Sequence, residues 1–105
     1  MEATEAIDAL AALAHETRLD IFRMLVRAGP AGLAAGAIAE RLDVPAPTLS
    51  FHLSNLAAAG LALSRREGRS ILYSADFSRM RALVDYLLED CCSGGSLRKQ
   101  RKGKQ

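Results

Sequence analysis

Two adjacent cysteines, Cys91 and Cys92, are the only cysteines in the chain. A disulfide framework needs spaced cysteines, so this pair does not cross-link the fold. Two neighbouring thiolates form a soft ligand pair, which suits a thiophilic metal or metalloid. The pair predicts a reactive or ligand-binding dithiol, with two buried, chemically silent cysteines as the alternative.

An enzymatic role for this dithiol has little support in the sequence. Reductase cysteines are usually spaced Cys-x-x-Cys at a helix N-terminus, which lowers their pKa, whereas Cys91 and Cys92 follow the expected last helix. The chain has only two histidines, and neither is expected to be catalytic. His15 is better explained as the start of a helix, and His52 as a residue that faces a DNA groove. We therefore expect no catalytic residues, no enzyme and no permanent cofactor.

Length and composition predict one small domain with a short tail. The chain has 105 residues, half of them apolar, and no stretch long and apolar enough to span a bilayer. The first residues are acidic where a signal peptide would be basic. We expect a soluble, cytoplasmic protein that does not associate with membranes.

Charge is unevenly distributed along the chain. Residues 1–97 carry nine basic and twelve acidic side chains, a net charge of −3, and the last eight residues carry the other five basic ones. We expect residues 1–92 to form the folded domain and residues 93–105 to be a flexible basic tail. An anionic partner must therefore meet a local basic patch on the domain.

Apolar periodicity and turn residues predict a mainly α fold with a small β-hairpin, in the order α-α-α-α-β-β-α. Gly60 ends the fourth helix, and Gly68 supplies the turn of the hairpin. The expected helices cover residues 4–14, 16–28, 36–42, 47–59 and 76–90, and the hairpin covers residues 61–74.

A winged helix-turn-helix fits this order, because two short helices flank the turn at residues 43–46 and a basic hairpin follows. At 100° per residue, Leu49, Leu53 and Leu56 of the fourth helix face the core. The expected DNA-binding residues lie on the rest of this helix and on the hairpin. Thr48, Phe51 and Asn55 point outward, Ser50 and His52 flank them, and Arg65, Arg66 and Arg69 follow phosphates from the wing.

Three segments resemble the ArsR/SmtB family of bacterial metal-responsive repressors. The first is LAHETRL at 13–19 with Ile21-Phe22. The second is the expected recognition helix, TLSFHL at 48–53 with Leu56 and Ala59-Gly60-Leu61. The third is the wing, REGR at 66–69 with Tyr73. The resemblance covers about residues 5–92. It implies a homodimeric repressor that binds an inverted-repeat operator and releases it when an inducer binds. It also implies DNA contacts at Thr48, Ser50, Phe51 and His52, with wing contacts at Arg66 and Arg69.

The end of the expected last helix, YLLEDCC at 86–92, resembles the arsenic-responsive branch of this family, whose cysteines lie at the C-terminal end of that helix. This resemblance implies a trivalent arsenical as inducer, bound by Cys91 and Cys92. Residues 38–42 and 16–28 contain no cysteine and residues 76–90 no histidine, so three other sites of the family lack their ligands. Two thiols match methylarsenite, or arsenite or antimonite if the partner chain or a small molecule adds a third. A thiol redox switch using the same cysteines and a dimerisation module that binds no DNA remain the alternatives.

The first and last helices are the expected dimer surface. Ala3, Ala6 and Ala9 would permit close approach of the two protomers. A ligand on Cys91 and Cys92 would strain the last turn of the last helix and change the spacing of the two recognition helices.

Overall fold

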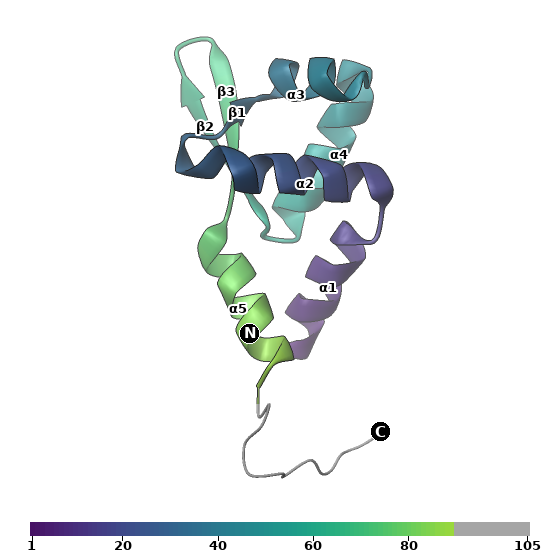
Figure 1. Ribbon diagram of the computed structural model, residues 1–105, viewed down its shortest axis with the longest axis vertical. Coiled ribbons are helices and arrows are strands. Elements are labelled where there is room, and N and C mark those ends of the chain that lie inside the picture. Colours follow the sequence, from purple (N-terminus) through teal and green to yellow (C-terminus); the bar gives the residue numbers. More distant parts are fainter. Residues whose placement is uncertain (90–105) are drawn as a thin grey trace.

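Five helices and a three-stranded antiparallel sheet make up the computed structural model, which describes residues 1–89 (Figure 1). The helices are α1 (Ala3–Leu13), α2 (Glu16–Ala28), α3 (Ala35–Leu42), α4 (Ala46–Ala58) and α5 (Phe77–Leu87). A short 3-10 turn, η1 (Gly29–Ala31), follows α2. The strands are β1 (Leu33–Ala34), β2 (Ala62–Glu67) and β3 (Ser70–Ala75). The predicted winged helix-turn-helix, mainly α with a small hairpin, is confirmed.

The last helix is shorter than predicted. It ends at Leu87 rather than near Asp90, and the amides of Leu88 and Glu89 close it by donating to the carbonyls of Val84 and Tyr86. Cys91, Cys92 and the predicted tail at 93–105 lie outside the described residues, as does the predicted domain boundary at residue 92.

The sheet contains one strand that the sequence analysis missed. Two residues, Leu33 and Ala34, pair antiparallel with Tyr73 and Leu72 of β3, giving the strand order β1-β3-β2. Gly32 makes this pairing possible: it has a φ of +76°, and a Cβ at this position would collide with the carbonyl oxygen of Tyr73. The wing is thereby joined to the segment between α2 and α3.

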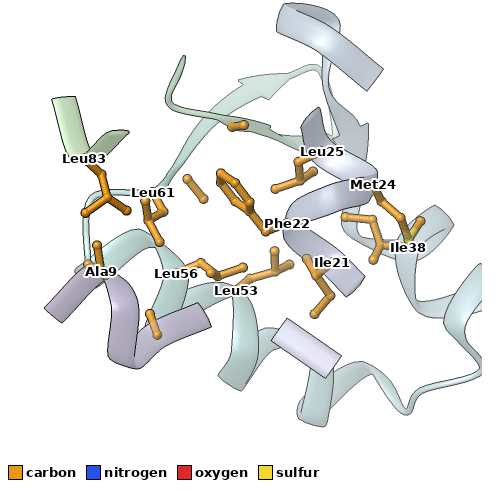
Figure 2. Close-up of a cluster of buried hydrophobic side chains, with 14 of the residues drawn as sticks. Ala9, Ile21, Phe22, Met24, Leu25, Ile38, Leu53, Leu56, Leu61 and Leu83 are labelled. Atoms are coloured by element: carbon orange, nitrogen blue, oxygen red, sulfur yellow. The ribbon is translucent and has the colours of Figure 1, made fainter. Parts of the chain in front are cut away.

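A single apolar cluster holds the helices against the sheet, and Figure 2 shows Phe22 at its centre. Leu61 lies on one side of this cluster, together with Ala9 of α1 and Leu83 of α5 (Figure 2). The buried members from α2 and α4 include Ile21, Phe22, Leu25, Leu49, Leu53 and Leu56.

Two of the three alanines expected at the dimer surface, Ala6 and Ala9, pack inside the protomer instead, whereas Ala3 is exposed. Ala6, Ala9 and Ala12 are buried in the apolar cluster, where their small side chains let α1 approach α4 and α5. The larger residues of the same helix, Ile7 and Leu10, are exposed instead. The exposed apolar side of α1 is therefore the one that carries Ile7 and Leu10.

We predict that Gly32→Ala destabilises the fold by about 2 kcal/mol or more, since a left-handed alanine is strained and its Cβ meets the backbone of β3. Urea or thermal unfolding would measure this loss. Gly36→Ala is the matched control: nothing lies within 4 Å of a Cβ there and the residue is helical, so stability should stay equal or rise by up to about 1 kcal/mol. Equal effects of the two substitutions would contradict the role given to Gly32.

Candidate nucleic-acid interface

Helix α4 has one buried side and one exposed side. Leu49, Leu53 and Leu56 are each at most 1% exposed and pack into the core, as their spacing predicted. Thr48 and Ser50 are exposed on the other side, and Phe51 is 63% exposed. The exposed side carries hydroxyl groups and an aromatic ring but no formal charge.

Asn55 lies at the edge of this exposed side rather than on it. Its side chain is half-buried, and its Nδ2 donates a hydrogen bond of 2.9 Å to the carbonyl oxygen of Phe51. It also lines a cleft of about 340 Å³ between α1 and α4, together with Asp8 and Arg18. The structure therefore places Asn55 toward α1 and not with Thr48 and Phe51.

His52 is buried, which differs from its expected position at the flank of a groove-facing surface. It is 6% exposed, and its ring centre lies 4.8 Å from that of His15. Nη1 of Arg18 lies 3.4 Å from Nδ1 of His52, and since a guanidinium can only donate, Nδ1 accepts and the neutral ring carries its proton on Nε2. Burial, and then the charges of His15 and Arg18, lower the pKa of His52 below its ordinary value of 6.5.

Arg18 connects the end of α1 to α4, a role that the sequence analysis did not assign. Its Nε donates a 2.8 Å hydrogen bond to the carbonyl oxygen of Ala12 in the last turn of α1, while Nη1 reaches His52 in α4. His15 caps α2 at the same junction, because its Nδ1 accepts a hydrogen bond from the amide of Thr17. The motif at residues 13–19 contained Arg18, but nothing in one sequence paired it with His52, 34 residues away.

The wing presents its arginines on opposite faces of the hairpin. Adjacent strand residues point to opposite sides, so Arg66, opposite Ile71, and Arg65, opposite Leu72, face apart. Arg66 and Arg69 are exposed and form no hydrogen bond or ion pair within residues 1–89. Gly68, with a φ of +62°, starts the two-residue turn that carries Arg69 at the tip.

Arg65 is occupied by contacts inside the protein. It donates hydrogen bonds to the carbonyl oxygens of Pro30 at 3.1 Å and Ala31 at 2.7 Å, and it pairs with Glu67 at 3.2 Å. These bonds fasten the wing to η1. The structure thus separates Arg65, which positions the wing, from Arg66 and Arg69, which are available to a ligand.

The tip of the β2–β3 hairpin and the first turns of α4 lie toward one end of the molecule, and α1 and α5 extend to the opposite end (Figure 1). The described part of the chain contains no group of three or more His, Cys, Asp or Glu side chains that could hold a metal ion. None of the helices within residues 1–89 has the length and apolar character that a membrane span needs.

Comparison with known proteins agrees with this geometry. A family model described as a helix-turn-helix domain matches residues 13–65. The transcriptional activator HlyU of Vibrio cholerae is 31% identical over 83 residues, which cover 79% of this chain and 74% of HlyU. An ArsR-like transcriptional regulator from Rhodococcus superimposes with a TM-score of 0.73 at 33% identity, covering 86% of this chain and 81% of that one. The chain belongs to the ArsR family of winged helix-turn-helix regulators.

Two further solved structures are of a homodimer and of a reduced protein. A homodimeric winged helix-turn-helix DNA-binding domain from Mycobacterium bovis matches with a TM-score of 0.66 and 31% identity, covering 83% of this chain and 81% of that one. A structure of reduced HlyU matches with a TM-score of 0.65 and 29% identity, covering 86% and 92%. HlyU and the Rhodococcus protein are both described as transcriptional regulators.

We predict that Arg66→Ala and Arg65→Ala affect DNA binding in different ways. Arg66→Ala should weaken binding to every sequence and reduce the slope of log K against log salt by about one unit for each protomer bound. Arg65→Ala should leave this slope unchanged and lower the unfolding free energy by about 1 kcal/mol, because its bonds to η1 are lost. Binding titrations at several salt concentrations, with thermal unfolding alongside, measure both effects. A reduced slope for Arg65→Ala would show that Arg65 also contacts phosphate.

We also predict that His52 makes the folded protein sensitive to mild acid. Because its pKa is lowered in the folded state, the unfolded chain binds the proton more readily, and stability falls as the pH drops below 6.5 toward the folded-state pKa. His52→Gln removes this titration while keeping a neutral side chain that can accept a hydrogen bond. Urea unfolding between pH 7.5 and pH 5.5 should give a shallower decline for His52→Gln than for the wild type, and identical declines would contradict the assignment.

Proposed function

We propose that this protein is a DNA-binding transcriptional repressor that binds an inverted-repeat operator as a homodimer and releases it when a trivalent arsenical binds Cys91 and Cys92. The observation that carries the DNA-binding part is the exposed, uncharged side of α4. The first turns of this helix lie at the same end of the molecule as the tip of the β2–β3 hairpin, which carries Arg66 and Arg69 (Figure 1). A recognition helix with a phosphate-binding wing beside it needs this arrangement.

Thr48, Ser50 and Phe51 are the residues proposed to enter the major groove. The two hydroxyls can donate to or accept from base edges, while Arg66 and Arg69 bind phosphates beside the groove. His52 supports this surface from inside the domain. The five basic residues at 98–104 add attraction to DNA of any sequence, by releasing counterions.

The homodimer is proposed to form through α1 and α5. Large apolar side chains remain exposed on both helices: Ile7, Leu10, Val84 and Leu87, with Leu88 just after α5. An apolar surface of this kind is typical of an interface rather than of a solvated helix pair. A two-fold dimer presents two α4 helices related by symmetry, which is why the operator should be an inverted repeat.

The proposed inducer site rests on the chemistry of the cysteine pair and on its place in the chain. Two thiolates saturate the two exchangeable positions of methylarsenite, whereas arsenite or antimonite would draw a third thiol from the partner or from a small molecule. Cys91 follows the exposed Leu88 by three residues. A ligand at Cys91 and Cys92 would therefore act at the edge of the proposed dimer surface.

A thiol redox sensor is the second candidate. One solved structure of the relative HlyU is of the reduced protein, and this observation supports testing a redox response in this chain. In this chain the same two cysteines would be oxidised instead of ligated. The DNA-binding part of the proposal is unaffected by which of the two applies.

We predict that selection from a random duplex pool enriches an inverted repeat with half-sites about one helical turn apart. Methylarsenite should release this duplex from the wild type at lower concentration than arsenite does. Cys91→Ser and Cys92→Ser should each bind the duplex with wild-type affinity and fail to release it. Fluorescence anisotropy measures binding and release in one titration.

Ser93→Ala is a matched control beside the cysteine pair and should respond like the wild type. Normal release by Cys92→Ser would remove the dithiol site. Release by peroxide, with loss of two hydrogens by mass and no response to arsenicals, would favour the redox sensor. Absence of any enriched duplex would contradict DNA binding itself.

A further inference from the structure

Phe51 is an exposed aromatic ring at the centre of the proposed recognition surface. Its side chain is 63% exposed, and it is the large hydrophobic residue that α4 turns to solvent, while Leu49, Leu53 and Leu56 of the same helix are buried. It is the sixth residue of α4, within the first two turns, and the N-terminal residues of a recognition helix are the ones that reach base edges.

Among the side chains around Phe51, its own ring is the one available to contact a base. The Nδ2 of Asn55 is engaged by the carbonyl oxygen of Phe51, and His52 is buried behind it with its ring centre 5.7 Å away. A phenyl ring neither donates nor accepts a conventional hydrogen bond to a base edge. The partner of this side chain must therefore be apolar.

The major groove offers one apolar group, the C5-methyl of thymine. The other base edges present donors and acceptors that a phenyl ring would desolvate without replacing their hydrogen bonds. We propose that Phe51 packs against a thymine methyl in each half-site and thereby selects an A·T pair at that position. This inference rests on the proposed function and adds the base class that the operator must contain.

Replacing thymine by uracil removes this methyl group and leaves the Watson–Crick pairing unchanged, which makes it a direct probe. The duplex enriched from a random pool is remade with a single uracil at each thymine in turn, in one half-site and then in both. Binding of each duplex is measured for the wild type, Phe51→Ala and Phe51→Leu. Phe77→Ala serves as a control, because Phe77 is also an exposed phenylalanine but lies at the start of α5.

The wild type should lose affinity about fourfold for one uracil at the contacted position and about fifteenfold when both half-sites carry it, the effect of exposing one methyl group per half-site. Phe51→Ala should bind the thymine duplex more weakly and show no further loss with uracil. Phe51→Leu should keep a reduced sensitivity, and Phe77→Ala should match the wild type. Because Phe51 is exposed, its substitution should leave the melting temperature nearly unchanged, which separates a lost contact from a lost fold.

Three results would overturn the inference. One is an enriched duplex in which no uracil position weakens the wild type. Another is equal uracil sensitivity in the wild type and Phe51→Ala. The third is unchanged DNA affinity for Phe51→Ala, which would show that the ring makes no energetically significant contact with the duplex. Failure to enrich any duplex is a different result, since it would overturn the proposed function as well.

Discussion

The packing of one side of α4 is the constraint on which the rest of the structure depends. Leu49, Leu53 and Leu56 are almost completely buried, so the rotation of α4 about its axis is fixed by the core. A turn of about 100° in either direction would exchange a leucine for a polar residue in the core and cost several kcal/mol. The exposed side of the helix follows from this. Thr48, Ser50 and Phe51 are outside because the leucines must be inside.

Turn residues and apolar spacing were enough to predict the element order and most helix ends, because glycine, proline and leucine periodicity act locally. The errors arose where a distant segment decides the outcome. The two-residue strand β1 forms because Gly32 lets the backbone approach β3, and two residues carry no periodic signal. The burial of His52 and the internal bonds of Arg65 could not be predicted, because their partners, Arg18 and the carbonyls of Pro30 and Ala31, lie 34 or 35 residues away.

The charge arrangement explains how a domain with a net charge of −3 over residues 1–97 can present a surface suited to DNA. Helix α4 contains no Asp, Glu, Lys or Arg, so no carboxylate on it opposes a phosphate backbone. The one carboxylate of β2, that of Glu67, is paired with Arg65 at 3.2 Å. Arg66 and Arg69 therefore keep their full attraction for phosphate, and this local field favours DNA even though the net charge of residues 1–97 does not.

In the proposed mechanism, ligand binding changes how two protomers sit against each other and leaves the packing inside each protomer unchanged. Inside a protomer, α1 packs on α4 through its alanines, Arg18 bonds the end of α1 and reaches His52, and Arg79 of α5 pairs with Glu5 of α1 at 3.4 Å. Because close-packed interiors transmit strain, we expect such a unit to move as a body. The contacts left to vary are those between two copies. The exposed leucines at the end of α5 directly precede the segment that contains Cys91 and Cys92. Under the proposed function, a ligand there would need to favour one arrangement of the two protomers over another by only a few kcal/mol to change the distance between the two α4 helices and release the operator.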